Sequence, residues 1–292
     1  MKLNRRTFNR LFAACGIAVA HSRVQAQTTT GAKLRFGVCT GPNHAAKLKG
    51  IGYDFLEGGV AKTLMPDLDD NTYAPELAKL KACGLPFHSC NGFLPGHFRL
   101  TGPEANHGPA LDYAEIACRR ADELGINFIV LGSSRARNVP DGFSHDRAKE
   151  QFIAFCQALG ERIKDRKVTI VLEPLNKKES NLLNKVEEGI EYVDAINRPR
   201  IQLLADFFHM MMENEGPESI VKAGSRIRHC HIAELEKRMA PGTSGEDLTR
   251  YFKALHTISY VGGVSCECGW PKENTEEAWK KALATMRTQA SA

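Results

Sequence analysis

Acidic residues are absent from the first 27 residues of this 292-residue chain, although that stretch contains five lysines and arginines. The rest of the chain has 34 basic and 34 acidic residues, so the formal charge of +5 belongs entirely to the N-terminus. Beyond residue 27 the sequence therefore lacks the excess positive charge that is typical of a nucleic-acid-binding surface. We expect no nucleic-acid partner.

Two sequence motifs are also missing. The loop after the first apolar run reads Cys39-Thr40-Gly41-Pro42-Asn43 and has no Gly-x-Gly-x-x-Gly, which disfavours an open sheet that binds a dinucleotide. No Cys-x-x-Cys pair occurs, and this argues against a zinc–thiolate site. Most of the eight cysteines after Cys15 fall in predicted strands or helices, so we interpret them as small buried side chains.

The acid-free N-terminus has the features of an export signal. Asn4-Arg5-Arg6-Thr7-Phe8 is a twin-arginine pattern, and the apolar segment Leu11 to Ala20 is too short to span a bilayer. We expect residues 1–27 to be a signal peptide for the twin-arginine export machinery. The mature protein would be periplasmic or otherwise exported, without a stable membrane anchor. A disordered basic tail and lipoprotein processing at Cys15 are the alternatives.

From residue 34 onward, apolar runs alternate with amphipathic helical patterns. Strands are predicted near 34–38, 53–57, 86–90, 127–132, 168–173, 201–206, 228–232 and 263–267. Helices are predicted near 43–50, 74–83, 108–124, 144–165, 184–197, 216–224, 245–257 and 273–287. Eight strand–helix units in about 255 residues match the size of a (β/α)₈ TIM barrel, an α/β fold. We therefore predict a linker at 28–33 and one barrel at 34–290.

Four candidate metal ligands lie at or near the C-terminal ends of predicted strands: Glu173, Asp206, His231 and Glu267. In a parallel barrel these strand ends converge on one face, which carries the chemistry. Three carboxylates and one imidazole suit a relatively hard divalent cation. We expect one such ion, with Mn²⁺ as the first candidate and Mg²⁺, Co²⁺ and Zn²⁺ as alternatives.

The same four residues predict a reaction. Four protein ligands leave open positions for two oxygens of a hydroxy-ketone, whose carbonyl the metal would polarise while it stabilises an enediolate. Glu173 and Glu267 come from strands on opposite sides of the barrel mouth. One glutamate could therefore take a proton from a substrate carbon and the other could return a proton to the opposite face. Such an exchange inverts the carbon, which is epimerisation.

The sequence around these residues resembles the xylose isomerase-like TIM-barrel superfamily over roughly residues 34–288. The motifs that carry the resemblance are Leu172-Glu173-Pro174-Leu175-Asn176, Asp206-Phe207-Phe208-His209, His229-Cys230-His231-Ile232-Ala233-Glu234 and Glu267. Within that superfamily the chain is most similar to sugar (phosphate) isomerases and epimerases of the ketose 3-epimerase and hydroxypyruvate isomerase type. The resemblance implies that Glu173 and Glu267 are both metal ligands and acid/base groups, and that Asp206 and His231 are ligands.

The resemblance also implies substrate-binding residues. It implies that His209 contacts the substrate and that Glu234 helps to hold the substrate near the metal. Glu57 resembles an acidic position that the family often has at the end of the second strand, and we group it with these residues. The family usually carries an arginine six residues after the ligand histidine; here that position is Lys237, with Arg238 beside it. Both are candidate substrate-binding residues, and the substrate can differ accordingly.

Three neighbouring features have alternative interpretations. We favour a buried, hydrogen-bonded role for His229 over metal ligation. Gly242-Thr243-Ser244-Gly245 could bind phosphate, but a helix start with Ser244 as its cap is the simpler interpretation. Arg135 and Arg137 could meet an anionic substrate, and a solvated loop is an equally good interpretation.

The predicted function is an exported, metal-dependent sugar isomerase or epimerase whose partner is a small ketose or keto-sugar. A lyase or dehydratase that eliminates from a keto-sugar at the same metal is the main alternative. An apurinic-site endonuclease is less favoured because it needs several zinc ions and a basic groove. A non-catalytic carbohydrate-binding protein is less favoured because the ligand set is intact. A homo-oligomer is a further expectation.

Overall fold

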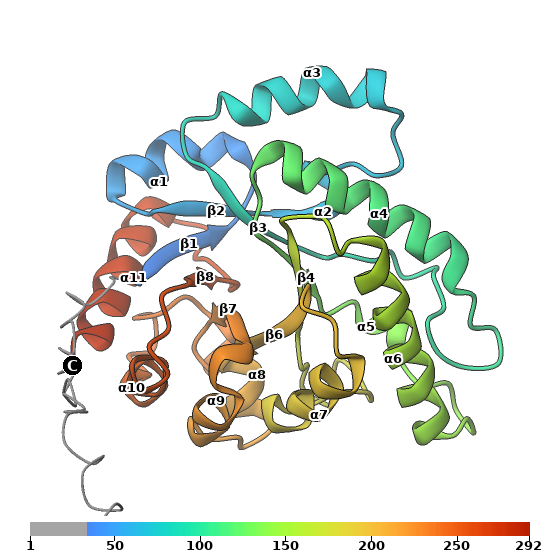
Figure 1. Cartoon of the computed structure of the whole chain (residues 1–292). Helices are drawn as coiled ribbons and strands as arrows, with labels where there is room; N and C mark the ends of the chain where they lie inside the picture. The colour runs from blue at the N-terminus through green and yellow to red at the C-terminus, as the bar shows by residue number, and fades with distance from the viewer. Residues whose placement is uncertain (1–33) are drawn as a thin grey trace, which may run out of the picture. The chain divides into compact units, whose positions relative to one another are not determined.

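A closed barrel of eight parallel strands forms the centre of the fold in the computed structural model, which describes residues 34–292 (Figure 1). The predicted signal peptide at 1–27 and linker at 28–33 lie outside the described residues. The strands are β1 (Arg35–Cys39), β2 (Phe55–Gly59), β3 (Phe87–Asn91), β4 (Phe128–Leu131), β5 (Thr169–Leu172), β6 (Ile201–Asp206), β7 (Ile227–Ile232) and β8 (Gly263–Cys266). Each strand pairs with the next in the sequence, and β8 closes the barrel on β1, where Arg35 lies opposite Gly263. The predicted TIM barrel is confirmed.

Helices return the chain between successive strands and surround the barrel (Figure 1). They are α1 (Ala45–Ile51), α3 (Asp70–Lys81), α4 (His107–Leu124), α6 (His145–Arg162), α7 (Val186–Ile196), α9 (Glu218–Ala223), α10 (Thr249–Thr257) and α11 (Thr275–Ala290). Short 3-10 helices occur at η1 (Pro42–His44), η2 (Gly224–Arg226) and η3 (Glu236–Arg238). Among residues 34–292, no helix combines the length and hydropathy that crossing a lipid bilayer would require.

Three short helices were not predicted: α2 (Val60–Thr63), α5 (Ser134–Arg137) and α8 (Phe207–Met212). Each follows the C-terminal end of a strand, on the face where the candidate ligands lie. With four to six residues apiece, they are too short for the 3.6-residue period of an amphipathic helix to show in the sequence. Two of them, α5 and α8, supply residues that hold the site.

The layer between barrel and helices is apolar and closely packed. In α4, Ala110, Ala114, Ala117 and Ala121 recur every three or four residues, which places them on one face of the helix. All four are completely buried. This buried face packs α4 into the apolar layer around the barrel.

Inside the barrel, the side chains change from aromatic to ionisable along its axis. The ring of Phe55 occupies the space next to Gly37 and Gly263, where an added Cβ would lie only 2.1 and 2.7 Å from ring atoms. Glu57 is two residues further along β2, so it points to the same interior face. Its carboxylate is almost completely buried. Charged side chains therefore lie in the interior toward the C-terminal end of the barrel.

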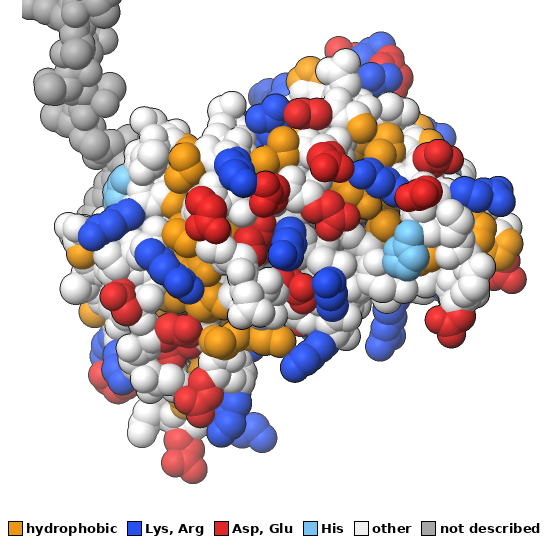
Figure 2. All heavy atoms as spheres, turned by 90° about the horizontal axis from the view of Figure 1, so that it is seen from below, with side chains coloured by type: hydrophobic (Ala, Val, Ile, Leu, Met, Phe, Trp, Pro, Cys, Tyr) orange, Lys and Arg blue, Asp and Glu red, His pale blue; other side chains and the backbone are white. Residues whose placement is uncertain are grey.

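Acidic and basic side chains are mixed on the face seen in Figure 2. Ion pairs link neighbouring helices, with Lys149 3.0 Å from Glu191 and Lys222 2.6 Å from Glu187. Such exposed pairs contribute little to stability, because water and salt screen them. The mixture of signs on the face in Figure 2 agrees with the balanced composition of the chain after residue 27.

Candidate metal and catalytic site

The structure brings the four predicted ligands together at the C-terminal end of the barrel. One ligand atom from each of Glu173, Asp206, His231 and Glu267 lies within 4.8 Å of the others. Asp206 ends β6, His231 lies near the end of β7, and the two glutamates directly follow β5 and β8. Glu267, with 24% of its side chain exposed, is the most open of the four. We call this set the candidate metal centre.

The two carboxylate oxygens of Asp206 have different roles: one caps a helix and the other faces the candidate metal centre. Its Oδ1 accepts hydrogen bonds from the backbone N–H groups of Phe208 at 2.8 Å and His209 at 3.4 Å. These bonds cap the N-terminus of α8. Since the cap orients the carboxylate, Oδ2 is left facing the other candidate ligands. The short helix α8 thus explains why the aspartate comes directly before an aromatic helical turn.

His231 is held between two carboxylates. Its Nε2 lies 2.8 Å from Glu57 Oε1, and its Nδ1 lies 2.9 Å from Glu173 Oε1. Burial lowers the pKa of His231, but Glu57 and Glu267 outweigh it and raise that pKa well above its ordinary value. A metal-ligating imidazole commonly donates its other N–H to a carboxylate, and Glu57 is placed for that role. This arrangement leaves Nδ1 directed at the centre.

Glu57 lies beneath the candidate metal centre rather than beside a substrate position. Its Oε2 accepts hydrogen bonds from Ser89 Oγ at 2.6 Å and from His229 Nε2 at 2.7 Å, and its Oε1 faces His231. Both of its oxygens contact protein side chains and the residue is only 1% exposed, so the structure places Glu57 against His231 and His229. This position suits support of the ligand histidine better than the substrate contact that was predicted for Glu57. His229 is buried and hydrogen-bonded, as predicted.

The two glutamates of the centre differ in acidity. Burial raises the pKa of Glu173, and the charge of Glu267 raises it further. Burial would also raise the pKa of Glu267, but His231 and Arg238 lower it to about 2. Asn91 donates to Glu267 Oε1 at 2.7 Å, and Arg238 donates to its Oε2. A pair of carboxyl groups whose pKa values are pushed apart suits acid and base roles.

The side chains of Lys237 and Arg238 lie in different places. Lys237 has 82% of its side chain exposed and pairs with Glu236, so the structure does not bring it to the candidate metal centre. Arg238 reaches the centre, with Nη2 3.4 Å from Asp206 Oδ2 and its guanidinium 4.8 Å from the ring of Phe208. Both residues have a left-handed backbone conformation, with φ of 54° and 53°. These two successive left-handed residues bring Arg238, and not Lys237, to the candidate metal centre.

His209 is brought to the centre, as predicted. Its Nδ1 accepts from the backbone N–H of Asn176 at 3.2 Å and from the side-chain amide at 2.8 Å. The proton is therefore on Nε2, which lies 3.5 Å from Asp206 Oδ2. The roles of Asn176 and Asn91 were not predicted. Their signal was available, because Asn176 lies within the glutamate motif of β5 and Asn91 is the last residue of β3.

The structure places Glu234 against a neighbouring loop and not among the residues of the candidate metal centre. Glu234 is completely buried, and its carboxylate accepts four backbone hydrogen bonds from a single loop. The donors are Gly242, Ser244, Gly245 and Glu246. Successive N–H groups of this kind form an anion-binding concavity, and here the protein's own glutamate fills it. The loop therefore neither binds phosphate through these groups nor starts a helix, since α10 begins only at Thr249.

Arg137, on α5, supports the site from behind. It is completely buried and donates to the backbone carbonyls of Leu131 and Glu173, at 3.3 and 2.8 Å. Burial lowers its pKa to about 10. Its interpretation as a solvated or substrate-facing residue is thus corrected. Gly132 is also constrained, because a Cβ there would lie 2.3 Å from Glu173 Oε2.

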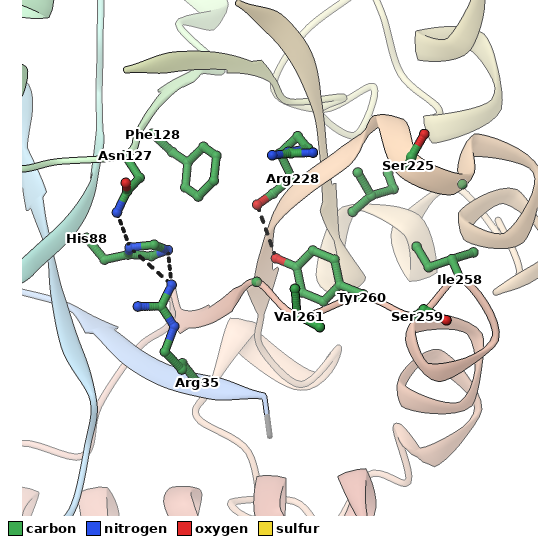
Figure 3. Close-up of a pocket in the computed structure, with 13 residues that line it drawn as sticks. Arg35, His88, Asn127, Phe128, Ser225, Arg228, Ile258, Ser259, Tyr260 and Val261 are labelled. Atoms are coloured by element: carbon green, nitrogen blue, oxygen red, sulfur yellow. Dashed lines mark hydrogen bonds between the residues drawn. The ribbon is translucent and has the colours of Figure 1, made fainter. Parts of the chain in front are cut away.

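A hollow of 330 Å³ lies at the opposite, N-terminal end of the barrel (Figure 3). There Arg35 Nη2 lies 3.0 Å from His88 Nε2, and Asn127 lies 2.8 Å from the other ring nitrogen of His88. Tyr260 donates its hydroxyl to the carbonyl of Arg228 at 3.3 Å. None of the predicted site residues lines this hollow. In barrels of this type the N-terminal end serves stability rather than chemistry.

Comparisons with known proteins agree with the fold. A family model described as "Xylose isomerase-like TIM barrel" matches residues 45–289. The L-ribulose 3-epimerase of Methylomonas sp. (strain DH-1) is 34% identical over 116 residues, which are 39% of this chain and 40% of that protein. The 3-dehydro-D-guloside 4-epimerase of Escherichia coli (strain K12) is 28% identical over 130 residues, 44% of this chain and 49% of that protein. The matched stretches thus span less than half of either relative.

The fold is shared with solved structures over a much longer stretch. A crystal structure of D-psicose 3-epimerase in the presence of D-fructose superposes with a TM-score of 0.77 at 18% identity. The superposition covers 89% of this chain and 100% of that one. At this identity the likeness establishes the architecture alone.

Proposed function

The chain belongs to the xylose isomerase-like TIM barrel family, and we propose that it is a divalent-metal-dependent epimerase of keto-sugars. It would invert a carbon next to a carbonyl by removing a proton and returning one to the opposite face. The observation that carries this proposal is the meeting of Glu173 and Glu267 with Asp206 and His231 in one centre. The two curated relatives, both named as sugar 3- or 4-epimerases, support it.

The donor set of the candidate metal centre fits a divalent cation. Three carboxylate oxygens and one imidazole nitrogen lie close enough together to share one ion, and hard cations prefer oxygen-rich sets of this kind. Mn²⁺ is the ion that we expect first, with Mg²⁺, Co²⁺ and Zn²⁺ as alternatives. Bound there, the cation would polarise the substrate carbonyl and make the neighbouring C–H more acidic.

The residues of this chain would then move the proton. Glu173 and Glu267 approach the centre from β5 and β8, so a substrate carbon between them is within reach of one carboxylate on each face. Arg238 and Asn91 orient Glu267, and the bond from His231 orients Glu173. Each glutamate is therefore held in one position while it accepts or donates a proton.

Two groups are placed to orient the substrate. His209 presents its Nε2–H at the centre, and Arg238 presents its guanidinium beside Asp206. Both are donors, so they suit the hydroxyl oxygens of a sugar. Since phosphorylated sugars are scarce outside the cytoplasm, the predicted export favours an unphosphorylated sugar or sugar acid. Export itself, and assembly into a homo-oligomer, stay predictions.

A turnover assay in deuterated water tests the proposal. Mn²⁺-loaded protein is incubated with D-fructose, D-psicose or 3-keto-D-glucose, and products are identified by NMR. We expect an epimer that carries deuterium at the inverted carbon, because the proton exchanges through a carboxyl group. An unsaturated product would show elimination in place of epimerisation. An epimer without solvent deuterium would remove both glutamates from the proton-transfer role.

A further inference from the structure

A second hollow has a volume of 480 Å³. It lies between the end of β1, the start of α1 and the segment that leads from β8 into α11. Cys39 lines the hollow, and its sulfur and ligand atoms of Glu57 and His231 lie within 4.8 Å of one another. The lining of this hollow includes Cys39, Thr40, His44, Trp270, Asn274 and Trp279. We call this space the tryptophan hollow.

Both tryptophans of the chain line the tryptophan hollow. Their ring centroids are 6.3 Å apart and the rings are nearly perpendicular, at 77°. The ring of His44 meets Trp279 edge-on at a centroid distance of 5.1 Å. Trp279 is 5% exposed, whereas Trp270 is only partly buried and presents more of its surface to the hollow. Aromatic walls with a few polar groups are typical of small-molecule sites of this volume.

Trp270 is fixed relative to the candidate metal centre. It follows Glu267 by three residues, and the intervening Gly269 is tied to the loop after β7. The N–H of Gly269 donates to the carbonyl of Arg238 at 2.7 Å, and its carbonyl accepts from Ala240 at 3.1 Å. A ligand that contacts the indole of Trp270 would therefore lie at a set distance from both Arg238 and Glu267.

Polar groups accompany the aromatic walls of the tryptophan hollow. The rim is polar, with Asn274 and an ion pair of 3.7 Å between Lys47 and Glu276. An occupant with apolar faces and hydroxylated edges, as in a sugar ring, matches this combination.

We propose that the tryptophan hollow binds the second unit of a glycoside, so that the substrate is a keto-sugar in glycosidic linkage rather than a free monosaccharide. This inference rests on the proposed function. The candidate metal centre would take the keto-sugar unit, and the tryptophan hollow would take the sugar ring on the other side of the glycosidic bond.

Intrinsic fluorescence gives a direct binding test, because the chain has only two tryptophans and both line the hollow. The probes are 3-ketocellobiose and 3-keto-D-glucose, which differ by one glucose unit. We expect 3-ketocellobiose to change the tryptophan emission with saturation, and 3-keto-D-glucose to change it much less. Equal responses to the two sugars, or no response to either, would overturn the proposal.

A kinetic test uses variants of Trp270. Trp270→Ala should lower the ratio of kcat/KM for 3-ketocellobiose to that for 3-keto-D-glucose by about ten- to a hundredfold. Trp270→Phe keeps an aromatic face and should restore most of the ratio. Val261→Ala changes an exposed residue at the N-terminal end of the barrel and should leave the ratio unchanged. An unchanged ratio in Trp270→Ala would contradict the proposal.

One further variant separates this proposal from the proposed function. Asp206→Asn should abolish turnover of both sugars while 3-ketocellobiose still changes the tryptophan emission. A wild-type protein that shows the emission change but never forms an epimer would refute the epimerase and keep the glycoside site. A protein that epimerises both sugars equally well, without an emission change, would refute the glycoside site and keep the epimerase.

Discussion

Buried histidines at the two ends of the barrel experience opposite electrostatic environments. At the C-terminal end, His231 lies among Glu57, Glu173 and Glu267, and these carboxylates raise its pKa despite burial. At the N-terminal end, burial lowers the pKa of His88 to about 3, and His229 and Arg35 contribute to the same shift. The imidazole is therefore a charged or metal-binding group at one end and a neutral structural group at the other.

The difference shows how one barrel separates chemistry from support. The carboxylates at the C-terminal end are buried close together, and without a cation their mutual repulsion is unfavourable. A bound cation would neutralise this charge. The N-terminal end satisfies its polar groups among themselves and with aromatic neighbours, such as the ring of Phe128, 5.2 Å from that of His88. Each of the following predictions perturbs one side of this comparison.

The largest expected effect concerns Glu173. Glu173→Gln keeps the shape of the side chain but removes its basic oxygen, so turnover should fall by roughly 10²–10⁴-fold, as for loss of a positioned general base. Metal should be partly retained. The control is Lys237→Ala, which changes an exposed side chain outside the site and should turn over like the wild type. Turnover of Glu173→Gln within a few-fold of wild type would exclude Glu173 as an acid/base group.

Glu57 has the next largest expected effect. Glu57→Gln removes the carboxylate that holds Nε2 of His231, and loss of such a support typically costs about 10–100-fold in metal affinity. The matched control is Ser89→Ala, which removes a hydrogen bond to Glu57 and keeps its charge. Titration calorimetry with Mn²⁺ compares the two variants. If both variants bind Mn²⁺ equally well, Glu57 does not orient the ligand histidine.

Residue type and spacing predicted some residues of the site correctly and others incorrectly, for physical reasons. The strands and four ligands were predicted because residue type and spacing alone place carboxylates and a histidine at consecutive strand ends. Whether Lys237 or Arg238 reaches the site depends on two successive left-handed residues, for which neither residue type is a signal. The role of Glu234 depends on how the distant loop at 242–246 folds back onto it. The inward orientation of Glu57 could have been predicted from the sequence, because alternation along β2 places its side chain on the same side as that of Phe55.

A smaller effect is expected at the N-terminal end. The pKa of His88 is about 3 in the folded protein, below its ordinary value near 6.5, so folding favours the neutral ring. The stabilisation is complete above pH 6.5 and is lost as the pH falls toward 3, amounting to about 2 kcal/mol of lost stability at pH 5. His88→Gln cannot take up a proton, so its unfolding temperature should fall less between pH 7.5 and 5 than that of the wild type. Parallel curves for the two proteins would show that His88 does not titrate in this way.

The central claim is that Glu173, Asp206, His231 and Glu267 bind one divalent ion, and a calorimetric titration with Mn²⁺ tests it most directly. The wild-type protein should bind one equivalent, and binding should weaken in acid because protons compete for the ligands. Asp206→Asn, which leaves an amide in place of a charged ligand, should lose most of the affinity. One equivalent of Mn²⁺ bound with unchanged affinity by Asp206→Asn would contradict the assignment.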